Sequence, residues 1–242
     1  MDYQAEIVAR ASWITELLRT SGCQGIVLGL SGGKDSSVVA TLCKRATDNV
    51  LGVIMPCSSL ASDSNDALRL AAAIGLETIS IDLSAVMNLH LSAISEACGE
   101  VTALAASNMK PRLRMTTLYT IAQNRRALVA GTSNRSERCM GYFTKWGDGA
   151  SDFNPIADLT VSEVLRLGEA LGVEHDLLYK TPSAGLFVGQ TDEAEMGVSY
   201  KAIDSYLLQG ADTITNEERA IIERASRISE HKRRPIPTYR EI

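Results

Sequence analysis

One short segment brings together residue types that bind phosphate: Gly29, Leu30, Ser31, Gly32, Gly33, Lys34, Asp35 and Ser36. The paired glycines allow backbone conformations that other residues avoid, so amide N–H groups can approach an anion closely. An apolar run precedes the segment and a helical pattern follows it, and the start of a helix carries partial positive charge. The segment therefore predicts a phosphate site between a strand and a helix.

Asp35 decides which kind of phosphate site this can be. A Walker A loop requires Ser or Thr directly after Gly-Lys, and here Asp35 occupies that position. A carboxylate repels phosphate unless a cation lies between them, and Mg²⁺ suits the oxygens of both groups. The plainer alternative is a serine-glycine turn whose helix Asp35 merely caps. The full strand–SGGxDS–helix arrangement favours the Mg²⁺–phosphate interpretation.

The rest of the chain supplies alternating elements that could position this loop. Short apolar runs predict strands at 25–30, 50–55, 78–83 and 127–130. Helical spacing and composition predict helices at 3–19, 36–45, 66–74, 84–98 and 113–123. Buried strands that alternate with helices predict an α/β fold, with a doubly wound, mostly parallel, Rossmann-like sheet covered on both faces.

The second half of the chain adds a long segment without a clear period. Residues 131–155 are rich in Gly, Ser, Asn and Asp, and a loop of this length is usually functional. Capping-box patterns at 160–163 and 215–218 predict two further helices, the last running towards Arg234. No linker interrupts the chain, so we expect one domain over 1–242, with a C-terminal helix and tail at about 215–242.

The composition argues against several classes of protein. The net charge of the 242 residues is −5, whereas general nucleic-acid binders are more often basic. No apolar run approaches the roughly 18 residues that a membrane span needs. Five cysteines form no CxxC pair, which favours reduced thiols without a catalytic role. We expect a soluble, cytoplasmic protein that binds neither nucleic acid nor membrane.

Several motifs resemble those of a known family. The SGGxDS loop resembles the pyrophosphate-binding loop of the N-type ATP pyrophosphatases, which cleave ATP between the α and β phosphates. Motifs similar to one branch, the ammonia-dependent NAD synthetases, are RLRM at 112–115, GTSNRSE at 131–137, GYFTKWGD at 141–148, TPSAGL at 181–186, QTDE at 190–193 and GVSY at 197–200. They occur in the order of that family. The chain is therefore identified as a member, which implies an adenine nucleotide alpha hydrolase-like fold.

The resemblance implies a reaction and its nucleotide site. In this family ATP activates the carboxylate of deamido-NAD as an adenylate, and ammonia then gives NAD, AMP and pyrophosphate. The resemblance implies that the loop at 29–36, Thr132 and Ser183 bind ATP. It further implies that Asp35 and Glu137 hold Mg²⁺.

The resemblance also implies a substrate site and an assembly. The residues implied to contact deamido-NAD are Arg112, Lys145, Asp152, His231 and Lys232. Asp148 would lie near the ammonia, so Asp35 and Asp148 are the candidate catalytic residues. Family members form homodimers whose substrate site spans the interface, which implies a homodimer here. Glutamine-using relatives carry an extra amidase domain, so free ammonia is the expected donor unless a separate glutaminase chain supplies it.

Two positions depart from the family pattern. Val161 stands where the family usually has a lysine that contacts ATP phosphate, and Lys34, Lys180 or the helix start at Thr160 could supply that charge instead. Replacing Val161 by Lys is then expected to lower KM for ATP. Pro111 stands where alanine is common and could shift the start of its helix. Val161 leaves two alternatives open: another AMP-forming amidating or thiolating ligase, and a catalytically weak ATP-binding sensor.

Overall fold

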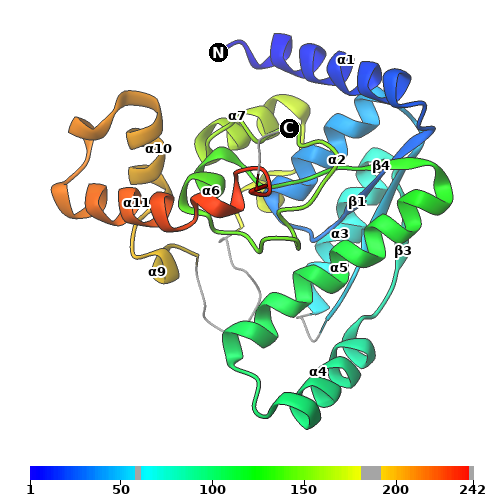
Figure 1. The fold of residues 1–242 in the computed structure, drawn as a ribbon. Helices are drawn as coiled ribbons and strands as arrows, with labels where there is room; N and C mark the ends of the chain where they lie inside the picture. Colours follow the sequence, from blue (N-terminus) through cyan, green and yellow to red (C-terminus); the bar gives the residue numbers. More distant parts are fainter. Residues whose placement is uncertain (58–60, 181–191, 240–242) are drawn as a thin grey trace.

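Parallel strands form the centre of the molecule (Figure 1). In this computed structural model, which describes residues 1–57, 61–180 and 192–239, the strands are β1 (Gly25–Gly29), β2 (Val50–Ile54), β3 (Glu77–Ser80) and β4 (Ala127–Val129). Their order across the sheet is β3-β2-β1-β4. The chain thus adds strands on one side of β1 and then crosses to the other side. Ligands of open α/β sheets bind beyond the carboxyl ends of the strands at such a switch point, here between β1 and β4.

One face of the sheet carries the larger apolar core. It is covered by α1 (Tyr3–Ser21), α2 (Lys34–Ala46), α3 (Ala61–Ile74), α7 (Val161–Leu171) and α8 (His175–Leu178). Successive strand residues point to opposite faces, and accordingly Ile26 and Leu28 of β1 lie in this core. Val27, between them, belongs to the core on the other face. The continuous apolar sequence of β1 is therefore explained by burial on both faces.

The other face is covered by two helices, α4 (Ser84–Cys98) and α5 (Ala103–Arg125). Figure 1 shows α4 and the first turns of α5 projecting beyond the sheet. The Thr102 hydroxyl accepts a hydrogen bond from the amide of Ala105 and so caps α5. Pro111 lies inside α5, where it cannot donate to the carbonyl of Ser107. The expectation that Pro111 affects the start of this helix is wrong, since α5 begins at Ala103 rather than at residue 113.

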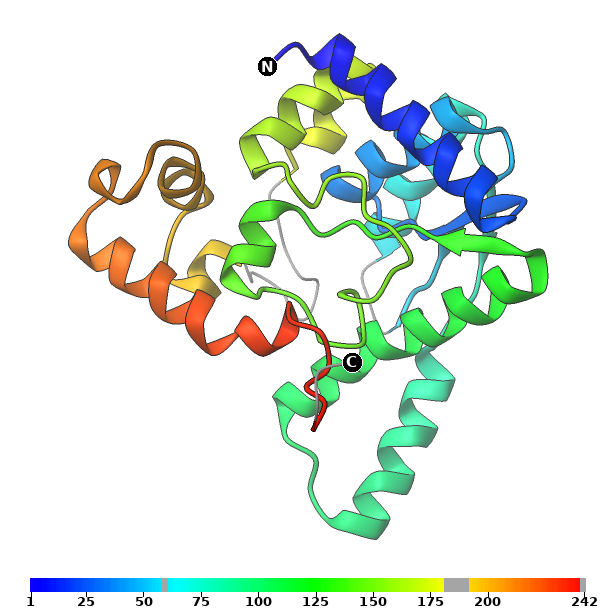
Figure 2. The same cartoon turned by 45° about the horizontal axis from the view of Figure 1, so that its top comes forward.

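A third group of helices flanks the sheet and reaches the switch point (Figure 2). These are the short α6 (Arg135–Met140) and α9 (Asp192–Met196), then α10 (Tyr200–Gln209) and α11 (Asn216–Ile228), with 3₁₀ turns at Ala211–Thr213 and Glu230–Lys232. They share an apolar cluster that includes Met140, Ile203 and Ile222. Both predicted capping boxes are present, at α7 and α11. The last α-helix ends at Ile228, before the predicted Arg234, and α6 interrupts the predicted loop at 131–155.

Arg10 joins the first helix to the segment that precedes α7. Its guanidinium donates to the backbone oxygen of Pro155 at 2.6 Å and to both carboxylate oxygens of Asp158 at 2.7 Å. Paired N–H···O bonds to a carboxylate fix geometry as well as adding energy. Residues separated by about 150 positions are thereby held at one corner of the molecule. Among the described residues, no helix is both long enough and apolar enough to cross a membrane.

Candidate active site

The glycine loop connects β1 to α2 and is shaped by its own serines. Gly32 has a φ of 78°, a left-handed conformation that favours glycine. The hydroxyls of Ser31 and Ser36 lie 3.0 Å apart, and Ser36 also donates to the carbonyl of Gly33 at 3.0 Å. Gly33 is the N-cap of α2 and provides no side-chain cap. The first amides of α2 are therefore suited to binding an anion at the switch point.

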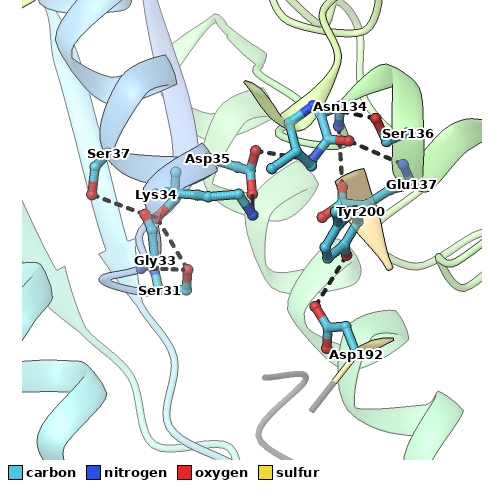
Figure 3. Close-up of polar contacts among 12 residues, drawn as sticks. Ser31, Gly33, Lys34, Asp35, Ser37, Asn134, Ser136, Glu137, Asp192 and Tyr200 are labelled. Atoms are coloured by element: carbon cyan, nitrogen blue, oxygen red, sulfur yellow. Dashed lines mark hydrogen bonds and ion pairs between the residues drawn. The ribbon is translucent and has the colours of Figure 1, made fainter. Parts of the chain in front are cut away.

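Lys34 and Asp35 form a buried ion pair directly behind this loop. The Lys34 ammonium donates to Asp35 Oδ2 at 2.8 Å, and the two side chains are 8% and 16% exposed. Figure 3 shows both side chains directed towards Asn134 and Tyr200. Burial opposes the charge on Lys34, but the carboxylates of Asp35 and Glu137 outweigh it and raise the pKa of Lys34. In this conformation the Lys34 ammonium pairs with Asp35, and its neutralisation of phosphate stays a prediction.

Asn134 links Asp35 to the second proposed metal ligand. Its side-chain nitrogen donates to Asp35 Oδ1 at 3.1 Å, and its side-chain oxygen accepts from the amide of Glu137 at 3.0 Å. Glu137 in turn accepts from the amide of Asn134 at 3.1 Å, which completes the capping box of α6. Burial, and next the charge on Asp35, raise the pKa of Glu137. The fold therefore brings the two carboxylates of the predicted metal site near each other, on either side of Asn134.

The donor set of this site can be tested against Mg²⁺. The part of the chain that the structure describes holds no group of three or more His, Cys, Asp or Glu side chains able to bind a metal. Mg²⁺, however, usually takes one or two carboxylates and completes its shell with phosphate oxygens and water. Asp35 and Glu137 offer such a pair, and their mutual repulsion favours a cation between them. The residues present fit Mg²⁺ bound together with a nucleotide.

Two aromatic hydroxyls border the site without having been singled out from the sequence. The ring of Tyr200 lies under the Lys34 ammonium, 5.5 Å from ring centre to nitrogen. The Tyr200 hydroxyl donates to Asp192 Oδ2 at 3.2 Å, and the Tyr142 hydroxyl donates to Asp192 Oδ1 at 3.2 Å. Asp192 is only 6% exposed. Both Asp192 and Tyr200 lie in motifs that carry the family resemblance, and these motifs were the signal in the sequence that could have identified them.

Three of the residues predicted to contact substrate form a connected group. Arg112 of α5 donates to the carbonyl of Lys145 at 3.4 Å. The Lys145 ammonium donates to the carbonyl of His231 at 2.8 Å and lies 5.4 Å from the ring centre of Trp146. Arg112 and His231 are exposed. Arg112 of α5, Lys145 of the 141–150 segment and His231 of the C-terminal turn therefore lie together, although they are distant in sequence.

Asp152 lies apart from this group, beside β4. It accepts hydrogen bonds from the amide of Val129 at 2.7 Å and from the hydroxyl of Tyr119 at 3.3 Å. Burial and the charge on Asp152 raise the pKa of Tyr119 to about 12. An open recess of about 560 Å³ is lined by Asp152, Tyr119 and neighbouring residues of α5 and β4. Asp152 can therefore contribute to a site at the outer edge of β4.

The C-terminal turn is fastened to the segment that follows α6 (Figure 2). The Lys232 ammonium donates to the carbonyls of Gly141 and Phe143, each at 2.7 Å, and stacks over the Phe143 ring. Partial burial lowers the pKa of Lys232, although the nearby Asp148 carboxylate opposes this shift. Asp148 accepts from the amide of Thr144 at 2.8 Å and also acts electrostatically on Glu137. Lys232 thus holds the segment that brings Asp148 towards Glu137.

Two predicted ATP contacts remain to be placed. Thr132 lies between β4 and α6, on the carboxyl side of the switch point, and is partly buried. Ser183 lies outside the residues that the structure describes, as does the whole TPSAGL motif. Lys180, suggested as a source of positive charge, donates instead to Asp66 Oδ2 at 2.8 Å. Of the predicted nucleotide site, the structure therefore describes the glycine loop, Thr132, Asp35 and Glu137.

The start of α7 cannot serve as the additional anion site that was considered. The amide of Val161 donates to the Ser136 hydroxyl at 3.2 Å, and the amide of Ser162 donates to Asp204 Oδ2 at 2.7 Å. Asp204 is 6% exposed and also accepts from the Ser136 hydroxyl at 2.5 Å. The Val161 side chain is buried in the apolar cluster with Ile203. The suggestion that the helix start at Thr160 binds phosphate is wrong, because the amides of Val161 and Ser162 already donate to groups of the protein.

Asn134 and Asp204 are the main polar groups that the sequence prediction did not assign. Asn134 lies within the GTSNRSE motif, and its spacing to Glu137 is that of a capping box, so this signal was present in the sequence. Asp204 has no such local signal, because its partners Ser136 and Ser162 are distant in sequence. Only the packing of α10 against α6 and α7 brings them together.

Comparisons with known proteins agree with this geometry. The NAD synthase family model matches residues 6–236. An NH(3)-dependent NAD(+) synthetase of Carboxydothermus hydrogenoformans is 47% identical over 225 residues, which cover 92% of each chain. An NMN synthetase structure from Francisella tularensis has a TM-score of 0.93 at 34% identity, with 98% of each chain covered.

A second solved structure points to the same family. The NH3-dependent NAD synthetase of Campylobacter jejuni has a TM-score of 0.82 at 33% identity, and the match covers 100% of both chains. With a family model over nearly the whole chain and relatives this similar, the protein belongs to the NAD synthase family.

Proposed function

We propose that this protein is an ammonia-dependent ligase that converts deamido-NAD to NAD, with ATP cleaved to AMP and pyrophosphate. One observation carries the proposal: the uncapped start of α2 lies at the switch point together with the carboxylates Asp35 and Glu137. Such a site suits a polyphosphate bound with a divalent cation. The printed names of relatives at high coverage, NH(3)-dependent NAD(+) synthetases, support the same substrate and nitrogen donor.

The chemistry requires activation of an unreactive carboxylate. The carboxylate oxygen attacks the α-phosphorus of ATP, pyrophosphate leaves, and an acyl-adenylate forms. Ammonia then attacks the acyl carbon, AMP leaves with the bonding electrons, and an amide results. No side-chain nucleophile takes part, so the protein acts by positioning the reactants and stabilising developing charge. Mg²⁺ at Asp35 and Glu137 would supply neutralising charge to the departing pyrophosphate.

Particular side chains receive roles in this proposal. The amides of the glycine loop bind the phosphates, and Thr132 and Ser183 contact ATP. Arg112, Lys145, His231 and Asp152 bind the dinucleotide, which is supported by their exposure or their positions around α5 and β4. Asp148 receives a proton from ammonia as the amide forms. Lys232, whose ammonium binds two carbonyl oxygens, acts by holding the segment that carries Asp148.

A homodimer is part of the proposal. Two large apolar side chains of α4 are exposed: Val86 is 50% exposed and Leu89 is 74% exposed. Leu104, near the start of α5, is 69% exposed on the same projecting pair of helices (Figure 1). Large apolar side chains that gather on a projecting surface mark interaction sites. A second copy of this chain is the partner that the family resemblance supports.

The decisive experiment measures products with ATP, ammonia and deamido-NAD. AMP and NAD formed in equal amounts would support the ligase, and removal of Mg²⁺ with a chelator should stop both. ATP binding without AMP release would favour a nucleotide sensor. AMP release that requires another carboxylic acid would favour a different ligase of the same chemistry.

A second substrate is favoured by a specific observation. The NMN synthetase structure has a TM-score of 0.93, against 0.82 for the NAD synthetase from Campylobacter jejuni. NMN differs from NAD by the absence of the AMP half, so an enzyme making NMN amidates the nicotinic acid mononucleotide. The same assay run with the mononucleotide and the dinucleotide compares kcat/KM directly. A higher kcat/KM for the mononucleotide would replace deamido-NAD as the proposed substrate.

A further inference from the structure

Lys34 is a buried cation at the centre of the proposed metal site. The residue is only 7% exposed, and its ammonium is 2.8 Å from Asp35 Oδ2. Lysine is almost never buried to this extent unless it is paired. The ammonium also makes a cation–π contact with the Tyr200 ring, whose centre is 5.5 Å from the nitrogen. The structure therefore keeps an ammonium group in the interior beside Asp35.

The surroundings of this ammonium are strongly negative. Asp35, Glu137 and Asp192 all act on Lys34 in the direction that favours its charged form. Asp35 and Asp192 are themselves held by neighbours, Asn134 and Tyr200 respectively. Several carboxylates close together destabilise one another unless a cation lies among them. In this arrangement the Lys34 ammonium is that cation (Figure 3).

We propose that Lys34 is a tethered counter-ion that holds Asp35 in place before a divalent cation binds, and releases Asp35 Oδ2 to Mg²⁺ when the Mg²⁺–ATP complex enters. The proposal rests on the proposed function, because it uses the Mg²⁺ site at Asp35 and Glu137. Lys34 is in this sense a positioning residue that acts through Asp35.

The hydrogen bonds of Asp35 show how such an exchange can occur without moving the carboxylate. Asn134 binds Oδ1, whereas Lys34 binds Oδ2. Departure of the ammonium therefore frees one oxygen for a metal while the other stays anchored to α6. The negative phosphates that arrive with Mg²⁺ also provide a new partner for the released ammonium. Exchange is then favourable with nucleotide and unfavourable with the metal alone.

A consequence follows for free Mg²⁺. In the absence of nucleotide, Mg²⁺ must displace an ammonium that is fixed to the same helix and therefore competes at very high local concentration. The resting site should bind free Mg²⁺ weakly. Removing the ammonium leaves the carboxylates without their counter-ion, so the metal should then bind more tightly and stabilise the fold.

The test is thermal unfolding of the full chain with Mg²⁺ alone, at constant ionic strength and without nucleotide. For the wild type, Tm should not change with Mg²⁺ up to millimolar concentration. Lys34→Met should lower Tm in chelator, and added Mg²⁺ should restore it, with half-maximal effect at a concentration on the order of tenfold below that of any wild-type response. Lys34→Arg, which keeps the charge, should behave like the wild type.

The matched control is Lys44→Met on the same helix. Lys44 also pairs with an aspartate, Asp48, but that partner is fully exposed and lies outside the site. Its Tm should not respond to Mg²⁺. The proposal is overturned if wild type and Lys34→Met show the same Mg²⁺ dependence, or if Lys34→Arg responds as Lys34→Met does. If Lys34→Met does not fold in chelator, refolding of that variant on addition of Mg²⁺ decides instead, and failure to refold contradicts the proposal.

The outcome is separable from that of the proposed function. AMP formation by the wild type with deamido-NAD or its mononucleotide tests the reaction, whereas the Mg²⁺ dependence of Tm uses no substrate. If Lys34 acts only on bound ATP phosphate and is not a counter-ion in the site without nucleotide, Lys34→Met should raise KM for ATP and leave the Mg²⁺ response of Tm unchanged. That result would overturn the counter-ion role while leaving the ligase activity intact.

Discussion

At the scale of single residues, the two oxygens of Asp35 have different partners with different chemistry. Oδ2 accepts from an ammonium and Oδ1 from a neutral amide. An asparagine at this position keeps the shape of the side chain but loses the charge. It also leaves the Lys34 ammonium buried without its nearest counter-ion, which is costly in the interior.

We therefore expect Asp35→Asn to abolish AMP formation and to lower Tm without loss of the fold. The first effect arises because the proposed metal bridge to phosphate is lost, and the second because Lys34 is unpaired. Product analysis and circular dichroism during heating measure the two effects. Asp48→Asn, which alters an exposed aspartate paired with Lys44, is the control and should retain both activity and Tm. Near-normal activity of Asp35→Asn would refute the metal assignment.

Glu137 should make stability depend on pH in an unusual direction. Burial, followed by the charge on Asp35, raises the pKa of Glu137 above its ordinary value of 4.5. The folded state then holds this proton more tightly than the unfolded state does. Stability is lost as pH rises from about 4.5 towards the folded pKa. A neutral glutamine at this position does not carry that cost.

Glu137→Gln should therefore unfold at a higher Tm than the wild type at neutral pH while losing activity, and the gain should vanish near pH 4. Glu218 is a matched control, since it holds the same position in the capping box of α11. Hydrogen bonds from the backbone and hydroxyl of Thr215 lower the pKa of Glu218, so Glu218→Gln should lower Tm at neutral pH. A Tm for Glu137→Gln below that of the wild type at neutral pH would contradict the prediction.

At the residue level, the sequence contained a local signal for each proposed metal ligand. Asp35 follows the glycine loop directly, and Glu137 lies in a motif with a capping-box spacing. The direction of the Lys34 side chain could not be predicted in this way. It depends on carboxylates from α6 and α9 that only the folded chain brings near α2. The tertiary structure therefore adds a partner for Lys34, the Asp35 carboxylate, that the sequence prediction did not include.

At the scale of elements, the N-termini of α2 and α7 differ in function: the first is a candidate ligand site, and the second is a structural contact between helices. Gly33 gives α2 no side-chain cap, whereas the amides of α7 bind Ser136, Asp204 and Thr160. Both helices start near the switch point. Of the two, only α2 has an N-terminus without a side-chain cap, so only its amides are suited to binding an external anion.

Asp204→Ala should lower the free energy of unfolding by about 2–4 kcal/mol, because it leaves two buried hydrogen-bond donors without their carboxylate. Those donors are the Ser136 hydroxyl and the Ser162 amide, which belong to α6 and α7. Urea denaturation followed by fluorescence measures the change. Asp212→Ala, at an exposed aspartate in the turn after α10, should change it by less than about 0.5 kcal/mol. Equal changes for Asp204→Ala and Asp212→Ala would show that Asp204 does not stabilise the contact between α6, α7 and α10.

Val161 gives a prediction that reverses the one made from sequence. Because its side chain packs in the apolar cluster with Ile203 and Ile222, Val161→Lys should destabilise the fold by about 2–4 kcal/mol. Val161→Met enlarges the side chain but keeps it apolar, so it should cost less than Val161→Lys, about 1–2 kcal/mol. Urea denaturation compares the two variants. A stable Val161→Lys protein with a lower KM for ATP would restore the earlier expectation.

Element boundaries show where sequence reasoning was sufficient. The prediction of β1 and β2 was accurate to one residue at their ends, because continuous apolar runs of this length are typical of strands buried on both faces. α5 starts earlier than predicted because Thr102 caps it and Pro111 is accommodated within the helix. Pro111 packs close to Gly147 of the 141–150 segment. A tertiary contact of this kind cannot be read from local propensity.

At the scale of the whole molecule, the proposed dimer depends on an exposed apolar surface. Leu89→Glu places a charge on the side of α4 that would meet a second copy, so it should shift a dimer towards monomer in size-exclusion chromatography with light scattering. Leu89 is 74% exposed, so the fold of each chain should be unaffected. Leu208→Glu, at a 47% exposed leucine of α10, is the control and should leave the mass unchanged. A wild type that is monomeric at all concentrations would refute the dimer.

The link from Arg10 to Pro155 and Asp158 has a consequence for how the chain matures on the ribosome. Translation delivers α1 first, and the Arg10 guanidinium can then pair with Glu6 of the same helix, but its partners Pro155 and Asp158 arrive only when the residues before α7 have been made. At about 5–20 residues per second, that interval lasts on the order of 10–30 s. The edge strand β4, which pairs with β1, also arrives late. The part of α1 that packs against α7 thus stays uncovered for much of synthesis, which makes nascent chains truncated before Pro155 the expected substrates of chaperones.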